Sequence, residues 1–353
     1  MKKNRLVITC LMIGVVGILL GSIGLLLGGR VYGITMGGNG IVVNSNANAN
    51  SQEGYQFLKE TLELEDFTDL KMDISFADVE IVESDHFALE YCVRSDRPIT
   101  AEMQNGAMTI SQKSQTGNYP FLSLGMVSFD TTMTAEYVNL YVPAGTAFES
   151  VAISLDSGNL TVGSLQADTI TLVDSFGSIT AQSLQAGDLN MDLDSGDVFA
   201  AAITAENLTI KNSFGGAEIV NAELTKGVIS MDSGDVILGQ IVGEELQMEL
   251  SFGSVDAGTL DVDSVKVELD SGNCRIGNLC TQKLDADSSF GELEIGLYEG
   301  VAAYAADASA NFGNIEVNRV DMGDVYKTLD SEGQPMLMIR CDSGDIILYD
   351  AAE

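Results

Sequence analysis

A tripeptide that ends in glycine returns every 19 residues through the second half of the sequence. It has two versions, Asp-Ser-Gly and Ser-Phe-Gly, which alternate strictly between residues 156 and 291. A short fixed period indicates a supersecondary unit that cannot bury a core alone and must stack on its neighbours. The sequence therefore predicts a repeat architecture, whose repeated glycines are Gly158, Gly177, Gly196, Gly215, Gly234, Gly253, Gly272 and Gly291.

Each repeat carries apolar residues at alternate positions, two and four residues after the glycine and again twelve and fourteen residues after it. In the first repeat these are Leu160 and Val162, then Ile170 and Leu172. Spacing by two indicates a strand with one buried face. Each repeat is thus expected to form two short strands joined by two turns, a tight one at the tripeptide and a looser one near Gly163.

This pattern predicts an all-β fold, a β-solenoid with about 19 residues per coil and neighbouring coils about 4.8 Å apart. No proline lies between Pro143 and Pro335, as a stack of hydrogen-bonded strands requires. The alternative is a coil of 38 residues, with all the phenylalanines on one edge and all the aspartates on another. We favour 19 because both versions of the repeat share one apolar pattern.

The two versions of the tripeptide differ in the residue that precedes them. It is apolar before every Asp-Ser-Gly, but polar before three of the four Ser-Phe-Gly motifs, at Asp174, Asn212 and Ser288. The phenylalanines are therefore expected to fill the corner space that Leu or Met fills in the next coil. These phenylalanines are Phe176, Phe214, Phe252 and Phe290.

The N-terminus differs in character from the repeats. Lys2, Lys3 and Arg5 precede an uncharged run over residues 6–29, which is long enough to span a bilayer with a cytoplasmic start. The sequence predicts one N-terminal transmembrane helix, a single-pass protein of the cell membrane and an extracytoplasmic C-terminal domain. A cleaved signal peptide is the competing interpretation.

Four segments follow from these patterns. We expect a cytoplasmic start and anchor over residues 1–30 and a polar linker over 31–54. A first coil with an irregular β insertion should occupy 55–150, including a hairpin turn at Asn105-Gly106. Regular repeats should occupy 151–353, with a loop at 321–337 and a C-terminal cap formed by the coil of Asp342-Ser343-Gly344.

The charge of the chain restricts its partners. Four of the 17 basic residues and none of the 52 acidic ones fall in residues 1–30, which leaves 13 − 52 = −39 for residues 31–353. This excess disfavours binding to nucleic acid or to an anionic membrane surface. Among the cysteines, Cys274 and Cys341 fall on core positions, and we expect no structural disulfide.

Calcium is the one metal that the motifs suggest, and no other cofactor is expected. Asp-Ser-Gly-Asp recurs at 194–197, 232–235 and 342–345, and acidic turns can hold hard cations. The alternative is that these side chains hydrogen-bond the local backbone. The candidate ligands are Asp194, Asp197, Asp232, Asp235, Asp342 and Asp345.

Catalysis is not expected. The aspartates recur at one repeat position instead of converging from different elements on a cleft. The only histidine, His86, lies in the irregular segment with no Cys-His or Ser-His constellation near it in sequence, and is interpreted as a surface residue.

The anchor, the coil-like segment Asp69–Ile81, the stretch from Val138 to Gly145 and the repeated units together resemble the bacterial DUF4097 family of putative adhesins over residues 55–353. The resemblance implies a membrane-tethered extracytoplasmic β-solenoid without catalytic residues. In this family, adhesion is a role assigned by analogy, and some relatives are linked to envelope-stress gene neighbourhoods.

Two functional hypotheses remain open. In the first, the solenoid is a non-catalytic binding or scaffold module that works with envelope partners. In the second, it is an adhesin that binds surface glycan or protein, with the turn aspartates possible ligands for calcium.

Overall fold

The computed structural model describes residues 33–37, 40–44, 56–112, 122–124, 135–329 and 333–351. The chain divides into two compact units, one of residues 1–55 with 115–134 and one of residues 56–114 with 135–353. In the first unit, β1 (Gly33–Gly37) pairs antiparallel with β2 (Gly40–Asn44) and with β9 (Leu122–Leu124). The segment expected to be a polar linker therefore contains two strands.

The predicted membrane span over residues 6–29 lies outside the described residues. Within the described ranges, no helix is both long enough and apolar enough to cross a bilayer.

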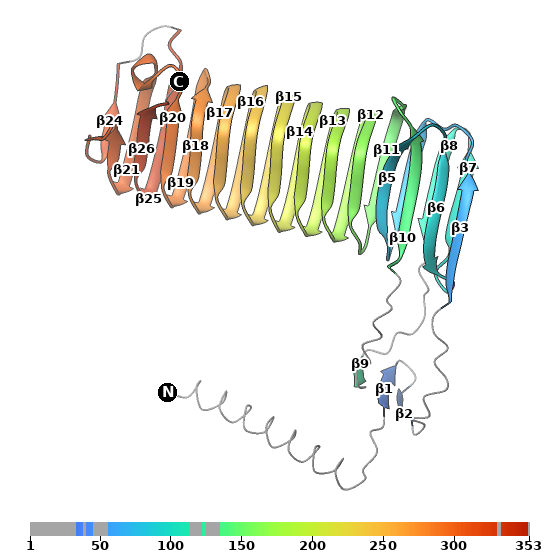
Figure 1. The fold of residues 1–353 in the computed structure, drawn as a ribbon. Helices are drawn as coiled ribbons and strands as arrows, with labels where there is room; N and C mark the ends of the chain where they lie inside the picture. Colours follow the sequence, from blue (N-terminus) through green and yellow to red (C-terminus); the bar gives the residue numbers. More distant parts are fainter. Residues whose placement is uncertain are drawn as a thin grey trace. The chain divides into compact units, whose positions relative to one another are not determined.

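The second unit is a β-solenoid (Figure 1). Its regular part consists of six consecutive strands of 17 residues, each paired in parallel with the next. Leu160 lies opposite Ile179 and Phe176 lies opposite Ser195, so partners are 19 residues apart. The coil therefore has 19 residues, and the 38-residue alternative is wrong. The strands are β12 (Leu160–Phe176), β13 (Ile179–Ser195), β14 (Val198–Phe214), β15 (Ala217–Ser233), β16 (Val236–Phe252) and β17 (Val255–Ser271).

Each coil has three buried sides, where the sequence predicted two strands and two turns. In β12 the buried pairs are Leu160 with Val162, Leu165 with Ala167, and Ile170 with Leu172. Between these pairs, two successive residues face outward, which interrupts the alternation. The strand therefore bends at two places without ending. In these six coils the strand is broken only at the repeated glycine and the residue after it.

The missed third side has a clear sequence signal. The residue seven positions after the glycine is apolar in every regular repeat and lies inside the coil: Leu165, Leu184, Ile203, Ala222, Ile241, Leu260 and Leu279.

The first coil and its insertion agree with the prediction. β4 (Asp69–Ile74) pairs in parallel with β11 (Ala147–Leu155), and β5 (Asp78–Ser84) pairs in parallel with β12, with Ala77 at the glycine place. The hairpin turn at Asn105-Gly106 is confirmed, with φ angles of 53° and 84° that suit a type I′ turn. The other strands at this end are β3 (Phe57–Glu63), β6 (Ala88–Arg94), β7 (Ile99–Gln104), β8 (Ala107–Gln112) and β10 (Tyr137–Pro143).

At the C-terminal end, the order of coils in space differs from their order in sequence. β25 (Met336–Ser343) pairs in parallel with both β19 (Lys283–Phe290) and β21 (Ala305–Phe312). The last coil of the chain is therefore inserted between two earlier ones, and the coil of residues 305–317 is the outermost. In the same way, β26 (Ile346–Asp350) lies between β20 (Leu293–Leu297) and β22 (Ile315–Val317).

The prediction that the coil of Asp342-Ser343-Gly344 forms the cap is thus wrong. The outer edge is covered instead by two short antiparallel strands, β23 (Val320–Asp321) and β24 (Val325–Lys327), from the segment expected to be a loop. Lys327 forms an ion pair of 2.7 Å with Asp307 there. Short strands and charged side chains of this kind protect an exposed sheet edge from pairing with other chains. The remaining elements here are β18 (Cys274–Cys280) and the 3-10 helix η1 (Val301–Ala303).

Candidate binding surface

The repeated glycines occupy the tight corner of each coil, where the backbones of adjacent coils come closest. At Gly196 the φ angle is 136°, and an added Cβ would lie 1.7 Å from the carbonyl oxygen of Gly177 in the preceding coil. The amide of Gly196 donates to the carbonyl of Phe214 in the following coil, at 2.8 Å. Both the conformation and the close approach exclude any larger residue.

The phenylalanines do not fill this corner. Phe176, Phe214, Phe252 and Phe290 are 65%, 63%, 63% and 61% exposed, so the expectation that their rings are buried is wrong. The residue two positions earlier in the strand is buried instead. Strict alternation would put both side chains on one face, so the chain must turn between them at the corner. That inner place is taken by Leu or Met in some coils and by the buried Asp174, Asn212 and Ser288 in others.

Two of these buried polar residues bond the corner backbone. The Asn212 amide donates to the carbonyl of Gly196 at 2.8 Å and accepts from the amide of Phe214 at 3.2 Å. Asp174 accepts from the amide of Phe176 at 3.1 Å through Oδ1, but its Oδ2 has no hydrogen-bond partner. Burial raises the pKa of Asp174 to about 6.

Seen along the stack, the position before the corner alternates between Phe and Ser from one end of the solenoid to the other. The insertion of β25 preserves the alternation, because it places Ser343 between Phe290 and Phe312. In spatial order the residues are Phe76, Ser157, Phe176, Ser195, Phe214, Ser233, Phe252, Ser271, Phe290, Ser343 and Phe312.

We call the six phenylalanines of this row the phenylalanine edge. They lie on every second coil, so neighbouring rings are separated by about 9.4–9.8 Å, twice the spacing of paired strands. Phe312, in the outermost coil, is 82% exposed. An ordered row of exposed apolar side chains is typical of an interaction site.

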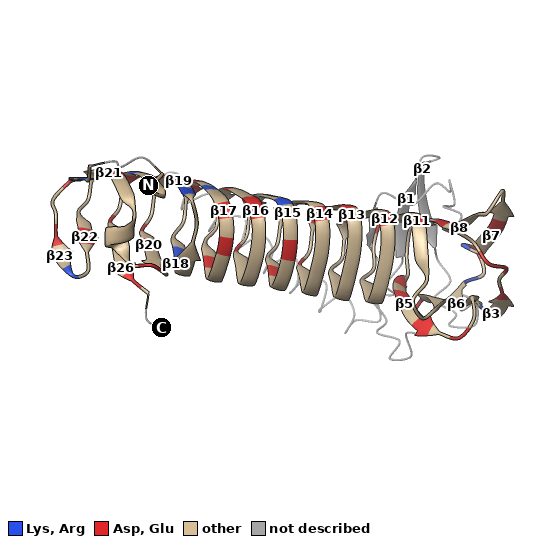
Figure 2. Ribbon diagram, turned by 90° about the horizontal axis from the view of Figure 1, so that it is seen from above, with Lys and Arg blue, Asp and Glu red and all other residues tan. Residues whose placement is uncertain are grey.

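Carboxylates alternate with the rings along this edge. Each serine coil carries an aspartate one residue before the serine, and all of these aspartates are exposed. Acidic residues also occur along the rest of the stack, with few basic residues among them (Figure 2). The edge aspartates are Asp156, Asp194, Asp232, Asp270 and Asp342.

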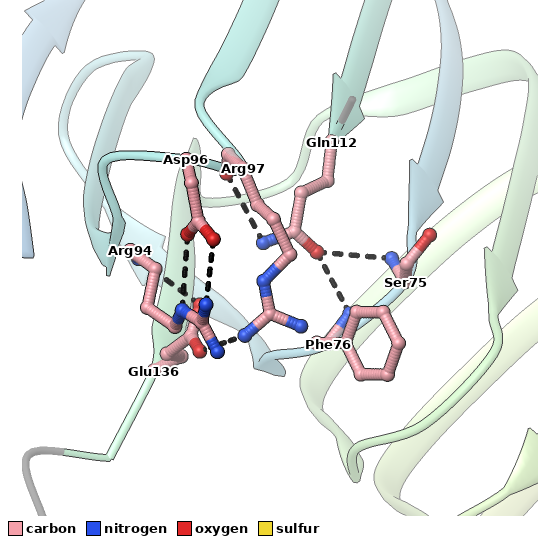
Figure 3. A network of polar contacts seen from close by, with 7 residues as sticks. All are labelled: Ser75, Phe76, Arg94, Asp96, Arg97, Gln112 and Glu136. Carbon is pink, nitrogen blue, oxygen red and sulfur yellow. Dashed lines mark hydrogen bonds and ion pairs between the residues drawn. The ribbon is translucent and has the colours of Figure 1, made fainter. Parts of the chain in front are cut away.

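The first ring of the edge is already covered by a cation. The Arg97 guanidinium lies over the Phe76 ring, 4.2 Å from its centroid, and forms an ion pair with Glu136 (Figure 3). Gln112 holds this turn in place, since its Oε1 accepts from the amides of Ser75 at 3.1 Å and Phe76 at 2.7 Å. Phe76 is consequently only 41% exposed.

The calcium candidates fall into two sets. Asp197, Asp235 and Asp345 each accept a hydrogen bond of 2.8 Å from a backbone amide. The amide belongs to an adjacent coil, whereas the alternative to calcium binding had expected the local backbone. Asp194, Asp232 and Asp342 are edge aspartates, in the coils that alternate with those of the phenylalanine edge. Across the described part of the chain, no group of three or more His, Cys, Asp or Glu residues could hold a metal ion, and calcium binding stays a prediction.

A shallow groove of 630 Å³ runs along a different corner of the stack. Small residues such as Ala167, Ala186 and Gly243 line it, together with acidic ones such as Glu206 and Glu244. These carboxylates recur at one repeat position and do not converge, so the groove lacks the arrangement of a catalytic cleft.

Among the described residues, the histidine and the cysteines form no reactive group with one another. His86 is a surface residue, as predicted, with Asp85 2.5 Å and Glu63 3.6 Å from its ring nitrogens. The described cysteines are all free, and Cys92, Cys274 and Cys341 are buried.

Comparison with known proteins identifies the repeats. The family model described as Toastrack DUF4097 matches residues 67–238 and 221–346, which together span the solenoid from β4 to β26. No curated protein matches the chain significantly.

Several crystal structures are similar to the chain at low identity and low TM-score. A putative adhesin from Parabacteroides distasonis is 16% identical, with a TM-score of 0.45 over 69% of this chain and 98% of that one. A putative lipid binding protein from the same species is 14% identical, with a TM-score of 0.40 over 84% and 98%. A putative adhesin from Parabacteroides merdae is 10% identical, with a TM-score of 0.39 over 68% and 93%.

Proposed function

The chain belongs to the Toastrack DUF4097 family, and from this we propose that it is a non-catalytic binding module of the bacterial cell envelope. In this proposal residues 6–29 hold the protein in the cell membrane, with the N-terminus in the cytoplasm and the solenoid outside. The solenoid then acts as a rigid arm that presents a binding surface to envelope partners.

The observation that carries the proposal is the phenylalanine edge. Exposing a large aromatic ring to water forgoes the favourable free energy of burying it, and here the exposure is repeated at the same place in alternate coils. Serine occupies that place in the coils between, so the backbone does not require an aromatic residue there. Binding to a partner explains the repeated exposure of these rings more simply than a contribution to folding stability does.

The scaffold suits binding better than chemistry. Adjacent coils contact one another over their whole length, so side chains on one edge are held at fixed intervals. Along the regular repeats of the described solenoid, the carboxylates recur at equivalent positions and do not converge on a cleft as those of a catalytic site would.

Crosslinking and affinity purification of the full-length chain from intact cells tests this function. We expect specific envelope components to be captured by the wild type and lost in the triple variant Phe176→Ser, Phe214→Ser, Phe252→Ser. Serine is the residue of the neighbouring coils, so the variant should fold. Ile237→Ser is the matched control, because Ile237 is an apolar residue 48% exposed on another face.

The material captured distinguishes the remaining roles. Recovery of membrane proteins would identify a scaffold or sensor component, and recovery of wall or surface material alone would identify an adhesin. Equal capture by the wild type and the triple variant would show that the phenylalanine edge is not the binding surface.

A further inference from the structure

We propose that the phenylalanine edge binds a cationic polypeptide segment in the polyproline II conformation, with an arginine or lysine at every third residue. This inference rests on the proposed function, since it names the class of partner that the same surface takes. Each cationic group would lie over one phenylalanine ring, between the aspartates of the two adjacent coils.

Among the described residues, such a contact is already present at the first ring of the edge. Arg97 covers Phe76 with its guanidinium 4.2 Å from the ring centroid, and Glu136 neutralises the charge beside it. A cation placed in this way is attracted both by the face of the aromatic ring and by the carboxylate. The remaining five rings lie in coils that adjoin those of the edge aspartates, and no cation lies over them among the described contacts.

The charge of the edge selects among partners. Phe214 lies between the coils of Asp194 and Asp232, and Phe252 lies between those of Asp232 and Asp270. A second copy of the chain would bring two rows of aspartates together, and the −39 charge of residues 31–353 would oppose that contact. A cationic partner removes the repulsion along the edge and gains ion pairs instead.

The spacing of the rings selects the conformation of the partner. Rings on every second coil are about 9.4–9.8 Å apart, and every third residue of a polyproline II helix lies on the same face at about 9.3 Å. Same-face residues repeat at about 6.8 Å in a β-strand, and every seventh residue of an α-helix repeats at about 10.5 Å. Of these three conformations, only polyproline II has a same-face repeat close enough to the ring spacing to match several rings in succession.

The test uses synthetic peptides and the full-length chain purified in detergent. One labelled peptide repeats Arg-Pro-Pro five times, and the other has the same composition with its five arginines contiguous. Both peptides carry the same charge, so a difference in affinity cannot come from charge alone. Only the first peptide has its arginines spaced to place one guanidinium on each ring. We expect the repeating peptide to bind about tenfold more tightly, as several weak contacts made together would give.

Variants locate the binding. The triple variant Phe176→Ser, Phe214→Ser, Phe252→Ser should lose most of the affinity for the repeating peptide, and so should Asp194→Asn with Asp232→Asn. Ile237→Ser and Glu218→Gln, on another face, should bind as the wild type does. Thermal melts of all variants should coincide, which separates lost binding from lost folding.

The inference is overturned if both peptides bind equally, or if binding survives the phenylalanine substitutions, since charge alone then suffices. It is also overturned if neither peptide binds while envelope capture still depends on the edge. In that case the proposed function stands and the partner is of another class. Treatment of the captured material with a glycosidase would reveal a glycan by abolishing recovery. If the triple variant matches the wild type both in peptide binding and in envelope capture, the inference and the role of the phenylalanine edge in the proposed function are overturned together.

Discussion

At the scale of single residues, Asp174 shows how a buried polar group can oppose the fold. The neighbouring positions in the stack, Leu155 and Leu193, surround it with apolar side chains, and one of its carboxylate oxygens has no partner. Burial raises its pKa from 3.8 to about 6. The folded state therefore holds the proton more tightly than the unfolded state, and this residue costs stability once it ionises.

We predict that Asp174→Asn stabilises the protein above pH 6. Asn212 occupies the equivalent place two coils away and donates to a corner carbonyl, so an asparagine at 174 should donate to Gly158. The free energy of unfolding should rise by about 1–3 kcal/mol at pH 7.5. The gain should shrink as the pH falls from 6 towards 4, because Asp174 becomes protonated in the wild type.

Chemical denaturation at pH 7.5 and pH 4.5 measures this effect. Asp156→Asn, at an exposed position of the neighbouring coil, is the control and should leave stability nearly unchanged. A loss of stability at pH 7.5 in Asp174→Asn would contradict the account.

We predict that Gly196→Ala destabilises the stack by about 2–4 kcal/mol, from the left-handed φ and the clash with the Gly177 carbonyl together. Gly163→Ala is the matched control. Gly163 lies in β12 of the same solenoid and has no left-handed φ. A Cβ added there would meet nothing closer than the carbonyl oxygen of Ile81, at 3.6 Å. Denaturant midpoints of the two variants should differ clearly, and equal midpoints would show that the corner can relax.

At the scale of elements, the C-terminal strands β25 and β26 are structural members of the stack and not its cap. We predict that a chain ending at residue 335 loses amide-exchange protection in β19 and β20 as well as in β21 and β22, because both pairs lose their common partner. A true cap could be removed with the four strands remaining protected. Hydrogen exchange followed by mass spectrometry distinguishes the two results.

Sequence reasoning at this scale succeeded where the signal was local. The Asn105-Gly106 turn was predictable because only a few residue types adopt positive φ, and the buried faces two and four residues after the glycine followed from strict alternation. The third side of the coil was missed because a bend in a continuous strand shifts the alternation by one residue. Consistent apolar residues at Leu165 and its equivalents were the signal available.

At the scale of the whole molecule, the alternation of Asp-Ser-Gly and Ser-Phe-Gly keeps like charges apart. Aspartates in successive coils would stack about 4.8 Å apart, and alternation doubles this distance. We predict that deletion of residues 197–234, a pair of coils, leaves the melting temperature near that of the wild type. Deletion of residues 197–215, one coil, should place Asp194 directly beside Asp232.

The single-coil deletion should lower the melting temperature at low salt and recover in about 0.5 M NaCl, where screening extends only a few ångströms. The two-coil deletion is its matched control and should show little salt dependence beyond that of the wild type. If the two deletions melt alike at low salt, the alternation serves the partner of the phenylalanine edge and not the stability of the stack.

The sequence by itself determined the coil, because a 19-residue period with glycine at one place and alternating apolar residues admits few ways to hide those residues from water. Tertiary structure decided the direction of each phenylalanine and the order of the last coils. A ring at the corner of a strand can face either way in a one-dimensional pattern, and the inward place had already been taken by the residue two positions before. Similarly, the coils of Phe312 and Ser343 carry the same repeat signature, so their order depends on which strand edge each one pairs with. Only that order completes the row of alternating rings and carboxylates along the solenoid.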